Sequence, residues 1–368
     1  MYHFILPSQD TWISSGSNTT TDESFKNQNF GKDQILEVRK QFFNGEFHHQ
    51  SRALVQFSGT SFTNMSQSIV EGTITNPKFF LKLHEINGNS KLSDNYTLHI
   101  QPISQSWTEG TGKFGDNPKN ILGCSWENRN NVINGDTTTW VDSGASVLNV
   151  SSSTQTFLNE SSDIEVEVTN MVNMWLQGQY SNYGMLIRVS GSQETDETTF
   201  CDSKFFGKNT HTIYPPRLEI RWDDHLPCTG SNTGSLNQLT SSGLIDNHLY
   251  LRGLQEGYKE NDRVRFRVGS RKKHIQKTFT NSVQTYTGSF IAESSGSYAI
   301  KDVATNEYII PFNDDYTLIG CDAGGMYFNQ WLDGFFPDRV YKILLKLKTD
   351  DGQEQIFDDD FEFIIRRS

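Results

Sequence analysis

The densest run of side chains able to bind another molecule spans residues 263–277 and contains seven basic residues and no acid. In a β-strand, Val264, Phe266 and Val268 would face the core, while Arg263, Arg265 and the following alternate residues face outward. Guanidinium groups pair with carboxylates and phosphates through several fixed donors. The expected partner-binding residues are Arg263, Arg265, Arg267, Arg271, Lys272 and Lys273. The alternative is a charged edge strand that blocks unwanted strand pairing.

Motifs for catalysis are absent from the sequence or lie in the wrong context. Residues 110–115 fit GxGxxG, but Asp116-Asn-Pro follows, where a dinucleotide site needs the start of a helix. No GxSxG, HExxH or EF-hand pattern occurs. Glu109 and Glu127 lie among aromatic residues and are the remaining candidates for a pair of glycosidase carboxylates. The sequence predicts a protein that is not an enzyme and has no catalytic residue.

Strand-like patterns are found along most of the chain. Short runs of alternating apolar and polar residues, typical of half-buried antiparallel strands, occupy residues 34–39, 52–57, 79–84, 97–103, 163–168, 184–189 and 217–222. Further runs occupy residues 247–251, 262–268, 285–291, 297–303, 341–348 and 360–366. The best helical pattern spans residues 168–176, with Met171, Met174 and Trp175 on one face and Thr169 or Asn170 as the cap. This pattern favours an all-β protein.

A polar segment divides the strand-like runs into two groups. Twelve of the fifteen residues 229–243 are Ser, Thr, Asn or Gly, a composition typical of a linker, although a long surface loop is the alternative. We therefore expect domains at residues 1–228 and 244–368, joined by the linker 229–243. The first domain is expected to be a jelly-roll β-sandwich, and the second an immunoglobulin-like β-sandwich.

Composition excludes several classes of protein. The chain has 368 residues, a formal net charge of −12 and 12% aromatic residues. The aromatic content argues against disorder, the charge argues against a nucleic-acid binder, and no apolar run is long enough to insert into a membrane. The first residues lack the pattern of a secretory signal, so we expect synthesis in the cytoplasm. The widely spaced Cys124, Cys201, Cys228 and Cys321 are expected to be free thiols.

Aromatic residues offer a second kind of binding surface. The chain contains seven tryptophans, most of which we expect in the core because large aromatic side chains are usually highly buried. Exposed tryptophans stack on sugar rings. Trp107, Trp126 and Trp140 are the candidate glycan contacts.

Eight short pieces follow one another in order between residues 9 and 223. They are Asp10-Thr-Trp-Ile, Asn27-Gln-Asn-Phe-Gly, Ser51-Arg-Ala-Leu-Val-Gln-Phe, Pro77-Lys-Phe-Phe-Leu-Lys-Leu, Trp107-Thr-Glu, Val166-Glu-Val-Thr-Asn-Met-Val-Asn-Met-Trp, Asn182-Tyr-Gly-Met-Leu-Ile and Pro215-Pro-Arg-Leu-Glu-Ile. In these pieces the segment resembles the DNRLRE family of jelly-roll domains, which are related to carbohydrate-binding modules. The resemblance implies a jelly-roll fold. Some relatives hold a structural calcium ion, for which Asp10 and Glu219 are the candidate ligands here; no other cofactor is expected.

The whole chain is similar to virion structural proteins of contractile-tailed phages of marine cyanobacteria. The similarity lies in residues 10–17, 107–116 and 125–131, and around Arg265-Phe-Arg-Val, Arg271-Lys-Lys and Phe361-Glu-Phe. It implies a virion protein of the baseplate, the tail-fibre attachment or the neck, whose partners are other virion proteins or further copies of itself. The alternatives are a carbohydrate-binding, host-attachment module on the particle surface and a capsid decoration protein. In both alternatives the protein is part of the virion, binds no nucleic acid and does not insert into a membrane.

Overall fold

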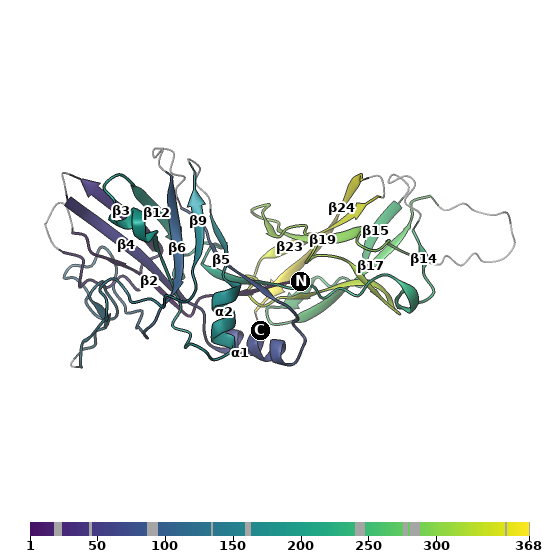
Figure 1. Ribbon diagram of the computed structural model, residues 1–368. Helices are drawn as coiled ribbons and strands as arrows, with labels where there is room; N and C mark the ends of the chain where they lie inside the picture. The colour runs from purple at the N-terminus through teal and green to yellow at the C-terminus, as the bar shows by residue number, and fades with distance from the viewer. Residues whose placement is uncertain are drawn as a thin grey trace. The chain divides into compact units, whose positions relative to one another are not determined.

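The computed structural model describes residues 1–17, 24–43, 46–86, 95–133, 135–158, 163–239, 247–274, 279, 288–349 and 352–367, with the backbone alone at 42, 43 and 46–48. The chain forms two compact units, which we describe separately (Figure 1). The N-terminal unit comprises Ile5–Glu71 and Lys78–Glu219. The C-terminal unit comprises Met1–Phe4, Gly72–Pro77 and Ile220–Ser368. Strands dominate both units, so the expected all-β sandwich class is confirmed.

The larger sheet of the N-terminal unit has the strand order β12-β3-β4-β11-β6-β9, with β2 paired to β4. Its strands are β2 (Gln9–Ser14), β3 (Ile35–Phe43), β4 (Glu46–Gln56), β6 (Tyr96–Pro102), β9 (Ser153–Phe157), β11 (Met185–Val189) and β12 (Cys201–Phe206). Alternation along β3 buries Leu36 and Val38 and turns Ile35, Glu37 and Arg39 to the other face. That outward face carries one of the two candidate sites.

A second sheet has the order β1-β13-β5-β10, made of β1 (Tyr2–Ile5), β13 (Arg217–Arg221), β5 (Lys78–Leu83) and β10 (Ile164–Glu167). The division between the units falls within β1 and within β13. A small hairpin pairs β7 (Asn128–Asn130) with β8 (Thr138–Thr139). The helices are α1 (Thr60–Val70), α2 (Thr169–Leu176) and α3 (Gly191–Thr195).

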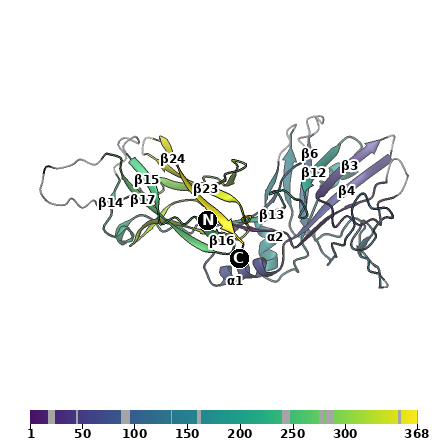
Figure 2. The same cartoon turned by 180° about the vertical axis from the view of Figure 1, so that it is seen from behind.

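The C-terminal unit consists of two further sheets (Figure 2). One has the order β14-β18-β17-β22-β21 with β15 paired to β17, and comprises β14 (Asn237–Gln238), β15 (Asn247–Arg252), β17 (Arg263–Lys272), β18 (Ser289–Phe290), β21 (Gly320–Asp322) and β22 (Gly325–Trp331). The other has the order β16-β24-β23-β19-β20, with β16 (Gly257–Lys259), β19 (Gly296–Asp302), β20 (Tyr308–Ile310), β23 (Val340–Lys348) and β24 (Glu354–Arg366). A 3-10 turn, η1, spans Gly230–Thr233.

Aromatic stacking joins the two sheets of the C-terminal unit. Phe328 of β22 stacks on Tyr298 of β19 with ring centroids 3.9 Å apart and on Phe266 of β17 at 5.1 Å. Phe363 of β24 packs against Phe266 at 5.7 Å. These residues belong to one buried cluster with side chains from both sheets, so the unit is held by a sandwich core. The aromatic content of the sequence is largely used in such cores.

The expected helix is present as α2, with Met171 and Trp175 buried as the sequence pattern predicts. The expected cap is wrong: Val168 precedes the helix and no side chain caps it. The Thr169 hydroxyl instead accepts a hydrogen bond from the backbone N–H of Phe79 at 3.0 Å. The Thr169 side chain, which the local sequence predicts as the helix cap, therefore forms a hydrogen bond with β5 instead.

The units differ from the expected domains 1–228 and 244–368. The first four residues, Gly72–Pro77 and the chain from Ile220 onward belong to the C-terminal unit. The expected linker 229–243 starts inside that unit, because it contains η1 and because Asn237 and Gln238 pair in parallel with Ser289 and Phe290. Residues 240–243 lie outside the described part of the chain. The polar composition of residues 229–239 thus belongs to a segment of the C-terminal unit and not to a linker between two domains.

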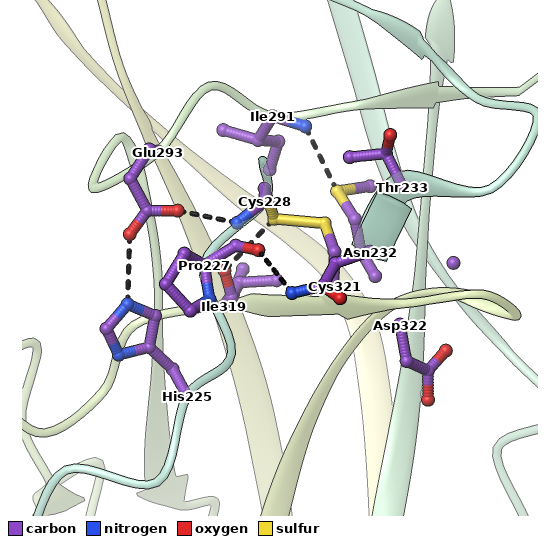
Figure 3. Close-up of a disulfide and its surroundings, with 12 residues drawn as sticks. His225, Pro227, Cys228, Asn232, Thr233, Ile291, Glu293, Ile319, Cys321 and Asp322 are labelled. Atoms are coloured by element: carbon purple, nitrogen blue, oxygen red, sulfur yellow. Dashed lines mark hydrogen bonds and ion pairs between the residues drawn. A yellow bond between two sulfur atoms is a disulfide. The ribbon is translucent and has the colours of Figure 1, made fainter. Parts of the chain in front are cut away.

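The expectation of four free thiols is wrong for one pair. Cys228 and Cys321 form a disulfide with their Cα atoms 4.9 Å apart, which Figure 3 shows between the segment before η1 and strand β21. The amide of Cys321 also donates to Leu226 O at 2.9 Å, so the two segments run side by side. A separation of 93 residues hides this pairing from local sequence patterns. Cys124 and Cys201 are free and buried.

The surroundings of the disulfide are polar on one side. Glu293 accepts a hydrogen bond from the amide of Cys228 at 2.6 Å and contacts His225 Nε2 at 2.9 Å, as Figure 3 shows. His225 Nδ1 lies 2.6 Å from Asp223. Burial disfavours the charged imidazole, but its hydrogen bonds to the carboxylates of Asp223 and Glu293 outweigh this effect and raise the pKa of His225 above its ordinary value. These contacts fix the segment that leads into the disulfide.

Candidate functional site

The arginine row of the C-terminal unit consists of Arg263, Arg265 and Arg267 on β17. Phe266 and Val268 lie in the core, and the three arginines are on the opposite face, as the alternation predicts. Among the described residues, β17 pairs with β22 along Arg263–Val268 and with β15 only along Arg267–Lys272. The alternative of a protective edge strand is therefore wrong for Arg267, but it stays open for Arg263 and Arg265, which have a paired strand on one side. The three side chains project from the face of the sheet opposite the core, where a partner can cover them.

Arg265 and Arg267 are held in place by neighbouring side chains. Both guanidinium groups reach Asp322, at 3.0 Å and 2.5 Å. The Arg265 Nε also donates to Asn329 Oδ1 at 2.9 Å, and its guanidinium carbon lies 4.1 Å from the ring centre of Tyr327. The hydrogen bond from Arg267, helped by Gly324 and Arg265, holds the pKa of Asp322 below its ordinary value. These two arginines are thus oriented before any partner arrives.

Arg263 has a different environment. It is opposite Trp331 in the β17–β22 register, and its guanidinium carbon lies 3.7 Å from the indole ring centre. The two residues line a concavity of about 520 Å³ together with Trp222, Asp224, Arg265 and Tyr327, among others. We call this concavity the Arg263 pocket. All of its lining residues belong to the C-terminal unit.

The remaining basic candidates extend the strand away from the pocket. Arg271 is opposite His248 and Lys272 is opposite Asn247 in the β15–β17 register. Arg271 is half-buried, while Lys272 and Lys273 are exposed. The structure does not place these three residues among those that line the Arg263 pocket. Five of the six expected partner-binding residues therefore lie on β17 and Lys273 follows it, but only Arg263 and Arg265 line the concavity.

The second candidate site is a groove of about 660 Å³ on the outward face of β3 in the N-terminal unit, which we call the β3 groove. Aromatic side chains form one part of it: Trp12 stacks on Phe30 with ring centroids 3.8 Å apart, and Phe25 and Phe114 pack beside them. Phe114 is 56% exposed, whereas Trp12 is 4% exposed. Phe114 is therefore the aromatic side chain that offers a free surface in this groove.

Polar side chains line the rest of the β3 groove. They include Lys32, Asp33, Glu37, Arg39 and Lys204. Asp33 accepts a hydrogen bond from Trp12 Nε1 at 2.9 Å and another from the amide of Phe114 at 3.1 Å. Burial raises the pKa of Asp33 and of Glu37 above their ordinary values. An exposed aromatic ring beside such donors and acceptors is an arrangement suited to a sugar ring.

The three tryptophans expected to contact a glycan are buried instead. Trp107, Trp126 and Trp140 are between 4% and 8% exposed and pack together in one hydrophobic cluster. Two indole N–H groups donate within the unit, from Trp107 to Tyr183 O at 2.8 Å and from Trp140 to Ser125 O at 2.9 Å. A sugar ring has no access to these faces. Their expected role is therefore wrong, because sequence alone cannot tell a buried tryptophan from an exposed one.

The GxGxxG segment is a structural loop. Asn29 donates to Glu109 O and Cys124 O at 2.7 Å each and accepts from the amide of Gly112 at 2.8 Å. A Cβ atom on Gly112 would lie 2.2 Å from Asn29 O. Residue 112 must therefore be glycine, because the backbone of Asn29 approaches closely. The segment is a loop, as the turn residues that follow it in the sequence predict. The Asn-rich piece of the family resemblance has the physical role of fastening this loop.

The acidic candidates are used inside the N-terminal unit. Glu109 pairs with Lys208 at 3.0 Å and with Lys32 at 3.4 Å. Asp10, expected as a calcium ligand, is 1% exposed and accepts a hydrogen bond from the amide of Lys208 at 2.5 Å. Burial raises the pKa of Asp10 to about 7. Glu219 is 2% exposed. In the described residues, no group of three or more His, Cys, Asp or Glu side chains could hold a metal ion.

Comparisons with known proteins add no family assignment. No family model matches the chain, and no curated protein matches it either. In the part of the chain that the structure describes, no helix is long and apolar enough to cross a membrane. The functional argument therefore depends on the two sites and on the sequence resemblance.

Proposed function

We propose that the chain is a non-enzymatic structural protein of a phage virion, which assembles through protein–protein contacts in the baseplate, the tail-fibre attachment or the neck. The observation that carries this proposal is the arginine row on the outward face of β17, in contact with the aromatic rings of Tyr327 and Trp331. Arginine and aromatic side chains are enriched in protein interfaces and supply much of their binding energy. The row combines both kinds of residue on one sheet face.

Preorganisation of the row favours a docking role. Binding costs free energy when long side chains lose their freedom, about 0.5–1.5 kcal/mol for each one immobilised. Asp322 and Asn329 already orient Arg265, and Asp322 also orients Arg267. The resemblance to virion proteins, which includes Arg265-Phe-Arg-Val, supports the same function.

The direct test is mass spectrometry of purified virions separated into heads and tails. We expect this protein in the tail fraction, in a fixed ratio to known tail proteins. Recovery in the head fraction would favour a capsid decoration protein. Recovery only from the lysate, with none in either particle fraction, would contradict the proposal.

A second candidate function, carbohydrate binding on the particle surface, is favoured by the β3 groove. Its support is the exposed ring of Phe114 beside Lys204, Glu37 and other polar groups. A glycan array probed with the full chain, with and without calcium, tests it. We expect Phe114→Ala to abolish any glycan signal. The control is Tyr180→Ala, which changes an aromatic side chain 37% exposed and outside the groove. A glycan signal that survives Phe114→Ala would exclude this groove as the binding site.

A further inference from the structure

Arg263 is the member of the arginine row whose donors are not used by the residues that the structure describes. Arg265 and Arg267 are both bound to Asp322. Arg263 has a stacking contact with Trp331, and among the described residues it has neither a hydrogen bond nor an ion pair. Stacking uses the face of a guanidinium group and leaves the N–H donors at its edge free. These donors are therefore available to a ligand in the Arg263 pocket.

Trp222 also lines the pocket, as part of its aromatic base. Its side chain is 1% exposed, and its Nε1 has no hydrogen-bond acceptor among the described residues. Its ring packs edge-on against Trp331 with centroids 5.3 Å apart. Because its Nε1 is buried, Trp222 gives the pocket an apolar aromatic surface, and Arg263 supplies the free donors.

The acid that lines the pocket does not neutralise Arg263. Asp224 accepts a hydrogen bond from Asn329 Nδ2 at 3.0 Å and, in the described residues, has no ion pair with Arg263. Asp333 interacts with Arg263 electrostatically, and burial raises the pKa of Asp333 above its ordinary value. Among the residues that line the pocket, the two arginines outnumber the one carboxylate. The complementary ligand is an anion with oxygen acceptors.

We infer that the Arg263 pocket binds a carboxylate carried by an acidic segment of a partner protein, with Arg263 as the main anion-binding residue. This inference rests on the proposed assembly function and names the chemistry of the partner. A carboxylate matches the paired donors of a guanidinium edge. A concavity of about 520 Å³ accommodates a few side chains of such a segment. A nucleic-acid strand is disfavoured, because the net charge of −12 repels a long polyanion.

The test uses the purified full chain and two synthetic peptides, capped hexaglutamate and the matched hexaglutamine. Titration calorimetry and tryptophan fluorescence measure binding at low ionic strength. We expect hexaglutamate to bind, with an affinity that falls as salt is added, and hexaglutamine not to bind. Replacing a charge-assisted, two-donor contact costs about tenfold or more in affinity, so Arg263→Gln should weaken binding by at least that factor.

Matched variants separate the pocket from general charge. Arg367→Gln removes an arginine whose side chain is 76% exposed and which is not among the residues lining the pocket, and we expect it to change the affinity by less than about twofold. Arg263→Lys keeps the positive charge and removes the paired donors of the guanidinium edge, and should weaken binding about threefold to tenfold. Thermal unfolding of each variant checks that the unit is folded. If Arg263→Gln fails to fold, Arg263→Lys decides the matter.

Three results would overturn the inference: no binding of hexaglutamate by the native chain, equal binding by the native and Arg263→Gln chains, or stronger binding of inorganic phosphate or a short oligonucleotide than of the peptide. The outcome is separable from that of the proposed function. If the chain binds the peptide but is absent from virions, only the proposed virion function is contradicted. If the chain is present in virions but does not bind the peptide, only the inference of a carboxylate-binding pocket is contradicted.

Discussion

A buried cluster of charges in the N-terminal unit gives the sharpest stability prediction. Glu194 of α3 is 5% exposed and receives two hydrogen bonds from Arg52 of β4, at 2.8 Å and 3.0 Å. Arg188 of β11 donates to the same carboxylate at 2.7 Å. Arg52 belongs to the Arg-Ala-Leu-Val-Gln-Phe piece of the family resemblance. We predict that Glu194→Gln destabilises this unit strongly.

The magnitude follows from the charges that would be left without a partner. Breaking a buried ion pair costs about 3–5 kcal/mol. The side chains of Arg52 and Arg188 are still 13% and 19% exposed, and each keeps another acceptor, Gly144 O at 2.6 Å and Gln101 Oε1 at 2.9 Å. We therefore expect a loss of about 2–4 kcal/mol, which for a unit of this size lowers the Tm by roughly 5–15 °C.

Scanning calorimetry of the full chain measures this change. Hydrogen exchange of the β4 and β11 amides assigns the affected transition to the N-terminal unit. The control is Glu167→Gln, since Glu167 pairs with Lys78 at 2.9 Å but is 46% exposed, and such a pair contributes about 0–1 kcal/mol. A Glu194→Gln transition that shifts no further than that of Glu167→Gln would refute the reasoning.

Three further predictions concern other parts of the chain. Replacing Cys228 and Cys321 by serine should lower the free energy of unfolding of the C-terminal unit by up to about 4–5 kcal/mol, because the disulfide closes a long loop. Calorimetry with and without a reductant measures this; an unfolding transition of the native chain that the reductant leaves unchanged would contradict it. Burial raises the pKa of Asp10 to about 7, so the folded state holds a proton that the unfolded chain releases near pH 4. Stability from this group is lost as the pH rises from about 4 through 7, and Asp10→Asn should flatten that part of the Tm–pH curve; an unchanged slope would count against it. Gly112→Ala should cost about 1–3 kcal/mol, since its Cβ would lie 2.2 Å from Asn29 O, whereas Gly115→Ala, with no atom within 4 Å of its Cβ, should stay within about 0.5 kcal/mol in denaturant unfolding.

Local patterns in the sequence were sufficient for the fold class and for the orientation of single strands. The alternation of Val264, Phe266 and Val268 with arginines predicts which face of β17 is buried, since successive side chains of a strand point to opposite faces. The periodicity of residues 168–176 likewise predicts α2. Such properties depend on residues that are close in the chain, so the sequence alone determines them.

Contacts between distant segments decided the sites. The strands that pair with each part of β17, and the stacking of Arg263 on Trp331, depend on contacts with β15 and β22. The β3 groove likewise brings together Trp12, Phe114 and Lys204, which are far apart in the sequence. Burial of Trp107, Trp126 and Trp140, and the pairing of Cys228 with Cys321, are long-range properties as well. Strand pairing and core packing bring such residues together, and the local alternation of a sequence carries no information on which strands become neighbours.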